Sequence, residues 1–333
     1  MAVKITIIGL GQIGTSVGLA LKDKPDLLER YGYDRDLGNA RLAENRGALD
    51  RVFINLPNAV SEADIVFLSL PMNEVQETLK LIAPDLSEGA VVMDSAPVKG
   101  VVADWAAELL PEGCFYVGLI PVINPAYLHT VDSGIDAAHE DLFRNTPMLI
   151  AAPPGTASAA VKLAADLTRL LGATPLFAEL VELDSLMAST HILPQLIGAA
   201  LVNATVDQPG WHEGRKLAGR PYAEVTGPAS HMSKPEALAN SALLSQENVL
   251  RTMDGFIGTL QSIRTDIANG DQELLTDRLK RAYEGRERWW KQRLAADWSN
   301  EQRPPAEIPT ASEVFGRLLG LGRKRSTKEE NSQ

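Results

Sequence analysis

Cysteine and aromatic residues are scarce in this chain: one cysteine, Cys114, occurs in 333 residues, and Phe, Trp and Tyr make up 5%. A lone cysteine forms neither an internal disulfide nor a thiolate metal site, so nothing requires an oxidising compartment and a cytoplasmic location is expected. The 5 histidines show no metal-ligand spacing. We therefore expect no structural or catalytic metal.

Positive charge and long apolar runs are also lacking. Lys and Arg number 32 against 43 Asp and Glu, a formal net charge of -11, which excludes the concentrated basic face that nucleic-acid binding needs. No apolar run reaches the roughly 20 residues of a membrane span, because Pro71, or His191 and Pro194, interrupt the longest candidates. The apolar run 5–8 leads into glycines rather than a cleavage site, so it predicts a strand and not a signal peptide. Neither nucleic acid nor membrane is an expected partner.

What is present is a change of pattern near residue 178. Before it, short β-branched runs alternate with amphipathic segments, the pattern of a doubly wound parallel sheet in an α/β fold. We expect this Rossmann-type domain to span 1–178. Its predicted strands are 4–8, 31–33, 65–70, 90–93, 115–117, 148–151 and 174–177, with helices at 13–21, 73–82, 101–110 and 156–171.

From residue 179 onward the periodicity is helical. An all-helical second domain is expected over 179–300, with long helices at 184–202, 235–268 and 271–297. The polar insert 207–234 predicts a loop with short helices that could line a site. Residues 301–333, with a small apolar segment at 314–321 followed by basic residues, predict a flexible tail.

The glycine pattern Gly9-Leu10-Gly11-Gln12-Ile13-Gly14 follows the first strand and opens the first helix. Gly9 permits the tight turn, Gly11 lets a pyrophosphate approach the backbone, and Gly14 lets helix and strand pack closely. The free N–H groups and the dipole of the helix N-terminus favour the anion. In this context the motif predicts a nicotinamide-dinucleotide site, and FAD suits it less well.

Asp34 stands 20 positions after Gly14, at the end of the second strand. A carboxylate there accepts hydrogen bonds from the adenosine ribose, which favours NAD. The same carboxylate would repel a 2′-phosphate, but the neighbouring Arg35 would attract one, so NADP stays an alternative.

Several segments resemble the prephenate/arogenate dehydrogenase family. They are 7–14, Tyr33-Asp34-Arg35, 63–66 with Leu70-Pro71, Asp94 with Val98-Lys99-Gly100, Leu142-Phe143 with Pro147, Leu183-Asp184, Leu193-Pro194 and Asn248, within 3–290. The resemblance implies a Rossmann domain followed by a helical domain that forms a homodimer. It also implies an oxidative decarboxylation in tyrosine biosynthesis, in which a ring carbinol gives a hydride to NAD(P). At the cofactor it places Gln12, Ile13, Leu70, Pro71 and Ser95.

The substrate positions of that family differ here. The histidine of its Gly-His-Pro motif, which takes the hydroxyl proton, falls on Ile120, and its serine before Val-Lys-Gly falls on Pro97. The arginine that binds the ring carboxylate falls near Gly227, with Arg220 as a substitute. An isoleucine accepts no proton, so we expect an altered substrate unless a rearranged loop brings in His129.

The family's histidines beside Leu-Pro fall on Ile192 and Gln195, while His191 stands one position away. One residue is about 100 degrees of a helix, so His191 needs a local rearrangement to point the same way. We take Gln195, Arg220 and Tyr222 as the substrate-binding candidates.

Three residues are candidate catalytic groups. His191, in an apolar helix, has the near-neutral titration that carbinol–carbonyl chemistry needs, although a core histidine is the alternative. Lys99 follows a strand at the carboxyl edge of the sheet, where it either orients a substrate oxygen or serves as an acid, or else is a solvated surface lysine. Asn124 either binds nicotinamide or substrate, or forms a turn before proline.

Other polar and aromatic residues have simpler expected roles. Trp289 and Trp290 are expected to pack in the core or at a subunit interface. We expect His212, Glu213, Arg215 and His231 to be exposed polar residues of a loop. The alternative is that they line the mouth of the site.

The leading hypothesis is a homodimeric NAD(P)-dependent dehydrogenase of the prephenate dehydrogenase type, acting on a small molecule. One alternative is a reductase of another small carbonyl or imine, of the β-hydroxyacid dehydrogenase type. Another is a dinucleotide sensor without catalysis, suggested by Ile120 at the base position.

Overall fold

An eight-stranded sheet organises the first half of the chain. The computed structural model describes residues 2–232 and 234–296. The strands lie in the order β3-β2-β1-β4-β5-β6-β7-β8, and neighbours pair in parallel except β6 and β7, which are antiparallel. Their bounds are β1 Val3–Ile8, β2 Leu28–Tyr33, β3 Arg51–Val52, β4 Ile65–Leu68, β5 Val91–Asp94, β6 Phe115–Pro121, β7 Pro147–Ala151 and β8 Thr174–Phe177.

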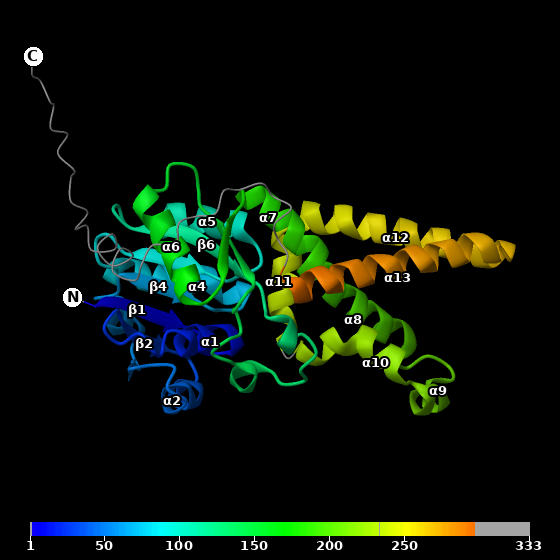
Figure 1. Cartoon of the computed structure of the whole chain (residues 1–333), viewed down its shortest axis with the longest axis horizontal. Helices are drawn as coiled ribbons and strands as arrows, with labels where there is room; N and C mark the ends of the chain where they lie inside the picture. The colour runs from blue at the N-terminus through cyan, green and yellow to red at the C-terminus, as the bar shows by residue number, and fades with distance from the viewer. Residues whose placement is uncertain (1, 233, 297–333) are drawn as a thin grey trace, which may run out of the picture.

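Helices cover both faces of this sheet (Figure 1). Because strand side chains alternate between faces, Ile7 enters one buried cluster and Ile8 the other. The first cluster is closed by α1 (Gln12–Ala20), α2 (Leu37–Asn45) and α6 (Ser158–Leu170), and the second by α3 (Leu56–Val60), α4 (Met72–Ile82) and α5 (Lys99–Leu109). The predicted doubly wound α/β fold is confirmed.

Three details of the sheet differ from the prediction. Strand β2 begins at Leu28 rather than at 31, because Leu28 and Arg30 are also buried. The edge strand β3 has only 2 residues, too few for a periodic signal. Strand β7 runs antiparallel to β6 because the connection between them holds two short 3₁₀ turns, Pro125–Tyr127 and Gly134–Ala137, and no crossover helix.

The second half of the described chain is helical, as predicted. Helices α12 and α13 lie side by side and project from the body, and α8, α9 and α10 form a second projection (Figure 1). The predicted helix 235–268 is wrong as one element, because the backbone leaves helical geometry at Ser245 (φ -111°, ψ 36°). The elements are α7 Leu180–Met187, α8 Leu193–Thr205, α9 Trp211–Leu217, α10 Arg220–Thr226, a 3₁₀ turn Gly227–His231, α11 Pro235–Leu244, α12 Gln246–Asn269 and α13 Gln272–Ala295.

A π-helical turn, Ala188–Ile192, joins α7 to α8. Its widened geometry includes a hydrogen bond from the Leu193 N–H to the Ala188 carbonyl oxygen, five residues back. Pro194 follows directly and has no N–H to donate to the carbonyl four residues earlier. A π turn adds one residue to a helical turn, so it shifts the direction of the side chains around it.

The helical segment Leu180–Thr205 is longer than the predicted helix 184–202. By length and composition it is the one described helix that could cross a membrane, with a hydropathy of 1.4 over its most apolar stretch. His191 and Pro194 do not interrupt it, because the π turn accommodates the proline. Only 22% of that stretch is buried.

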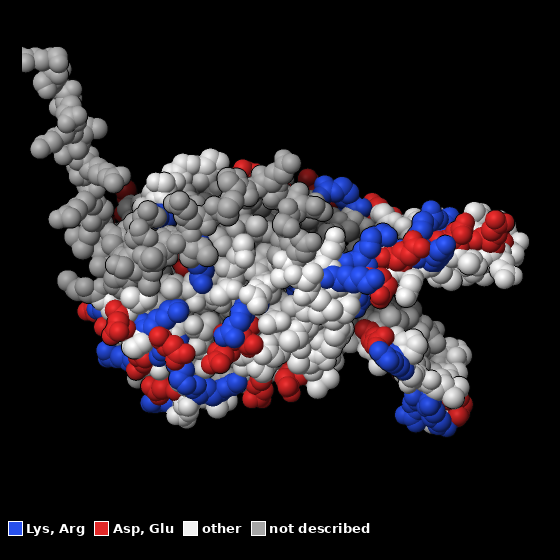
Figure 2. Space-filling model, viewed as in Figure 1, with Lys and Arg blue, Asp and Glu red and all other residues white. Residues whose placement is uncertain are grey.

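Charged side chains of both signs are mixed over the face shown in Figure 2, without a broad patch of one sign among the described residues. The predicted tail 301–333 lies outside the described residues.

Candidate functional site

The turn between β1 and α1 is open on one side only. A Cβ on Gly9 would lie 2.2 Å from the Ser69 carbonyl oxygen, and one on Gly14 would lie 2.0 Å from the Gly9 carbonyl oxygen. A Cβ on Gly11 would meet nothing within 4 Å. Within α1 no side chain caps the N-terminus and no acidic residue lies in the first turn. The first-turn N–H groups of α1 therefore have no side-chain cap, and the space beside Gly11 is open, which fits the pyrophosphate of a dinucleotide.

Asp34 lies beside this turn. Its Oδ2 accepts a hydrogen bond from the Leu10 N–H at 2.7 Å, and its Oδ1 accepts one from the Asp36 N–H at 2.8 Å. These bonds fix the carboxylate at the end of β2, and each oxygen keeps a lone pair for a ribose hydroxyl. The Gln12 side chain instead donates its Nε2–H to the Ala137 carbonyl oxygen, in the β6–β7 connection, at 3.1 Å.

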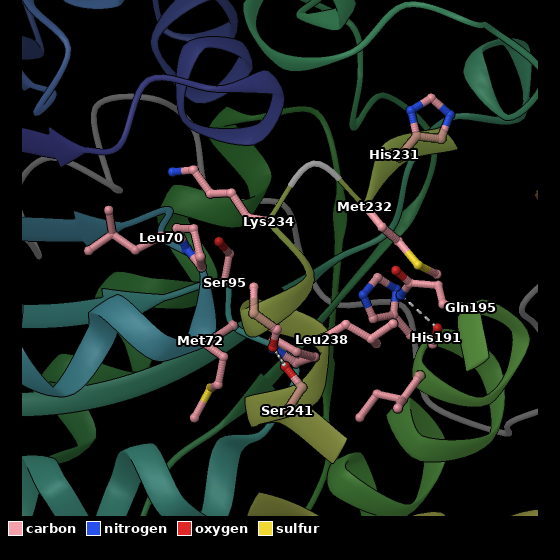
Figure 3. A pocket seen from close by; sticks show the side chains of 15 residues that line it. Leu70, Met72, Ser95, His191, Gln195, His231, Met232, Lys234, Leu238 and Ser241 are labelled. Carbon is pink, nitrogen blue, oxygen red and sulfur yellow. Dashed lines mark hydrogen bonds between the residues drawn. The ribbon is translucent and has the colours of Figure 1, made fainter. Parts of the chain in front are cut away.

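A cavity of about 350 Å³ lies where the carboxyl ends of β4 and β5 meet the helical half (Figure 3). This is the edge of a doubly wound sheet where ligands bind, and its volume suits a small metabolite. The lining residues are Leu70, Pro71, Met72, Ser95, Ala96, Pro97, His191, Ile192, Gln195, His231, Met232, Lys234, Ala237, Leu238 and Ser241.

The cavity brings together five of the predicted site residues. Leu70, Pro71 and Ser95 come from the sheet half, and His191 and Gln195 come from the helical half. Gln195 donates its side-chain N–H to the His191 carbonyl oxygen at 2.9 Å (Figure 3). The predicted cofactor edge and part of the predicted substrate site therefore share one space.

His191 lies on the π turn, so the rearrangement that the sequence required is present in the backbone. Its side chain is reachable from the cavity, but the surrounding protein lowers the pKa of the imidazole because the charged form is less well solvated there. A neutral imidazole that faces a ligand cavity can accept a proton at neutral pH.

Lys99 lies behind the cavity wall and not in the cavity. It is fully buried, and its Nζ donates to the Asp94 Oδ2 at 2.7 Å and to the Asp94 carbonyl oxygen at 2.9 Å. The Tyr116 hydroxyl donates to the Asp94 Oδ1 at 2.6 Å. Burial lowers the pKa of Lys99, while the Asp94 carboxylate opposes that shift. Both predicted alternatives, a ligand-contacting lysine and a solvated one, disagree with this burial.

Asn124 forms the predicted turn. Its Oδ1 accepts the Ala126 N–H at 3.1 Å and its Nδ2 donates to the Asp141 carbonyl oxygen at 3.3 Å. The residue does not line the cavity. Its amide holds the β6–β7 connection, so the ligand-binding alternative has no support in this geometry.

Arg220 and Tyr222 lie on α10, away from the cavity lining. Arg220 is exposed and pairs with Glu224 at 2.7 Å. The Tyr222 hydroxyl lies 2.8 Å from the Thr205 hydroxyl, which joins α10 to α8. Neither predicted substrate contact is formed by these two side chains in this arrangement.

Ile120 is buried, with 7% of its surface exposed, in β6. It does not line the cavity, and neither does His129, whose ring lies 5.4 Å from that of Trp290. The loop alternative for a catalytic histidine is therefore not realised by His129.

His212, Glu213 and Arg215 are exposed on α9, as expected. His231 is exposed as well, but it also lines the cavity, which is the alternative that the sequence left open. Trp289 is 46% exposed, and the Arg286 guanidinium lies over both tryptophan rings at 4.7 and 5.0 Å.

Sequence reasoning missed the cavity residues supplied by α11 and by the end of the polar insert. Met232, Lys234 and Ser241 belong to this set. The only signal was the insert itself, which was expected to line a site, and the position of α11 against α4 is not readable from its own residues.

Family models match most of the chain. The model described as the prephenate dehydrogenase nucleotide-binding domain matches residues 17–175. The model described as the prephenate dehydrogenase dimerization domain matches residues 181–281. The first match begins after the glycine turn, so that turn is independent support for a nucleotide site.

Whole-chain relatives agree with these matches. The chain is 26% identical to a cyclohexadienyl dehydrogenase of Zymomonas mobilis over 288 residues, covering 85% of this chain and 94% of that protein. It is 25% identical to Synechocystis arogenate dehydrogenase, with a TM-score of 0.67 and coverage of 86% and 99%. It shares the fold of prephenate dehydrogenase from A. aeolicus in complex with hydroxyphenyl propionate and NAD+, at 23% identity, a TM-score of 0.75 and coverage of 86% and 98%.

Proposed function

This chain belongs to the prephenate dehydrogenase family, and we propose that it is an NAD-dependent enzyme of tyrosine biosynthesis that oxidises prephenate or arogenate. The observation that carries the proposal is the shared cavity, in which His191 faces Leu70 and Ser95 at the carboxyl edge of the sheet. That edge is where the nicotinamide end of a dinucleotide lies when its pyrophosphate rests at Gly11.

Separate groups of residues would bind the pyrophosphate, the ribose and the nicotinamide of the cofactor. The N-terminus of α1 at Gly11 would hold the pyrophosphate, and Asp34 would accept hydrogen bonds from the ribose. Leu70, Pro71 and Ser95 form the wall against which the nicotinamide ring would rest. Bound NAD+ supplies one chemistry, the acceptance of a hydride from a carbinol carbon.

His191 is the proposed general base. As the carbinol C–H electron pair leaves as hydride, the hydroxyl proton passes to the imidazole, and the C–O bond becomes a carbonyl. The ring carboxylate then leaves as carbon dioxide and its electron pair enters the ring to give a phenolate. The imidazolium returns the proton to this oxygen, so the product is a phenol and the base is neutral again. The surrounding protein lowers the pKa of the imidazole by desolvation, which favours the neutral form that accepts the proton.

The polar groups of the cavity also bear on the substrate. Among the described residues that line it, Lys234 is the one permanent cation, and Ser95, Gln195 and Ser241 offer hydrogen bonds. The family's base and arginine positions hold Ile120 and Gly227 here, so His191 and these polar groups would take over the contacts with prephenate or arogenate.

We propose that the enzyme is a cytoplasmic homodimer. The helical half exposes many large apolar side chains, and the apolar segment Leu180–Thr205 is mostly exposed. A second copy of the chain would cover these side chains. Lipid is a poorer candidate, because the same segment carries His191 of the proposed active site. The exposed set includes Val181, Leu186, Leu250, Ile257, Leu260, Ile267, Leu274 and Leu279. Sedimentation should give twice the mass of one chain.

The direct test gives the purified protein NAD+ with prephenate or with arogenate. Growth of the reduced-nicotinamide absorbance, with equimolar phenolic product, supports the proposal. NADH binding without turnover of either compound would contradict the proposed substrates and leave only the nucleotide site.

A further inference from the structure

Glu74 lies between two cations that come from opposite halves of the chain. Its Oε2 is 3.2 Å from the Arg35 guanidinium, and its Oε1 is 3.4 Å from the Lys234 Nζ. The Glu74 side chain is 16% exposed, against 79% for Arg35 and 64% for Lys234. One largely buried carboxylate therefore uses both oxygens to hold two exposed cations.

One of these cations, Arg35, lies at the proposed ribose end of the cofactor site, while Lys234 lines the cavity. Arg35 directly follows Asp34, whose carboxylate is bonded to the glycine turn through the Leu10 N–H. In Figure 3 the Lys234 ammonium extends away from His191 and lies on the side of Leu70. An arginine next to the ribose is what accommodates the 2′-phosphate of NADP in Rossmann domains.

The fold keeps Glu74 in this position. It lies in the first turn of α4, where its N–H donates to the Pro71 carbonyl oxygen at 2.8 Å and where the helix dipole favours a carboxylate. Helix α11, which begins directly after Lys234, packs against α4. Exposed ion pairs are weak, but a carboxylate that is mostly shielded from solvent is screened less by salt.

We propose that Glu74 sets the preference of this enzyme for NAD(H) over NADP(H). By pairing with Arg35, and by being held in place through Lys234, it occupies the guanidinium that a 2′-phosphate would need. It also adds a negative charge near Asp34, so the phosphate would meet repulsion from two carboxylates. The inference rests on the proposed function only in requiring a bound nicotinamide cofactor.

The test compares dissociation constants for NADH and NADPH, measured by calorimetry without substrate, in the wild type and in Glu74→Gln. Glu77→Gln is the matched control, because it removes the same charge from an exposed position on the same helix. Glu74→Gln should bind NADPH about tenfold more tightly, equivalent to about 1.4 kcal/mol, with NADH affinity nearly unchanged. Glu77→Gln should change neither, and adding Arg35→Ala to Glu74→Gln should remove the gain.

An unchanged ratio of NADPH to NADH affinity in Glu74→Gln, with both cofactors bound, would overturn the inference and leave the proposed function intact. A wild type that binds neither cofactor would overturn both. Thermal unfolding of each variant shows that the comparison is made between folded proteins.

Discussion

The carboxylate of Asp184, on α7, accepts hydrogen bonds from the backbone N–H of Lys99 at 2.5 Å and of Gly100 at 3.0 Å, at the N-terminus of α5. This helix cap comes from the other half of the chain, 85 residues away. It joins the cavity wall that precedes α5 to the helix that leads into the π turn and His191. A Cβ on Gly100 would lie 2.9 Å from the Asp184 Oδ2, so the contact also depends on the glycine.

Replacing Asp184 should weaken both the fold and the site. Asp184→Ala is expected to lower the free energy of unfolding by about 1 kcal/mol, the usual loss for a helix cap, because burial raises the pKa of Asp184 and offsets part of its contribution. It should also lower kcat/KM by releasing the helix that carries His191. Urea unfolding and steady-state kinetics measure the two effects, and wild-type values for both would contradict this role.

Lys99 should be structural and not catalytic. Lys99→Met leaves the buried Asp94 carboxylate without its cation, so we expect a loss of about 3–5 kcal/mol in urea unfolding. Adding Asp94→Asn should recover part of that loss, since no charge is then left unpaired. A Lys99→Met protein of wild-type stability that has lost turnover would instead support the catalytic alternative.

The glycines of the first turn should separate folding from cofactor binding. Gly11→Ala should change stability by less than about 0.5 kcal/mol, since its Cβ meets nothing, yet weaken NADH binding at least about tenfold. Gly14→Ala should cost about 2 kcal/mol or more in stability, because its Cβ would lie 2.0 Å from a carbonyl oxygen. Equal effects of both changes on thermal unfolding would be inconsistent with this geometry.

The pH dependence of kcat/KM should report His191. The base works when neutral, so the rate should fall as the pH drops through the pKa of the imidazole, which desolvation by the cavity wall shifts below its ordinary value. The enzyme should therefore stay active at more acidic pH than an exposed histidine would allow. The exposed His212 is the control: His212→Gln should keep the acidic limb, and retention of that limb in His191→Asn would contradict the assignment.

The sequence alone predicted those features that depend on neighbours along the chain. Spacing within one strand–turn–helix unit predicts the turn at Gly9 to Gly14 and the position of Asp34. Periodicity predicts the helices that cover both faces of the sheet. Folding adds contacts between distant segments. Lys99 is buried because its Nζ pairs with the Asp94 carboxylate, which also accepts a hydrogen bond from the Tyr116 hydroxyl. Gly118 leaves room for it, since a Cβ there would lie 2.7 Å from the Lys99 side chain.

In the helical half, too, contacts between distant segments could not be predicted from the sequence. The π turn depends on a hydrogen bond between Leu193 and Ala188 that apolar periodicity does not encode. The pair of Glu74 and Lys234 joins residues 160 positions apart, which no local pattern reveals. Arg220 was chosen by alignment with a missing arginine, but its own helix supplies Glu224 as a partner one turn away.

The most direct test of the account is the kcat/KM of His191→Asn, measured with the substrate that the wild type oxidises, alongside the dissociation constant for NADH. If His191 is the proton acceptor, kcat/KM should fall about 10²–10⁴-fold with NADH binding unchanged, the effect of removing a general base from an intact site. A variant that turns over within about threefold of the wild type would contradict the assignment of His191 as the proton acceptor.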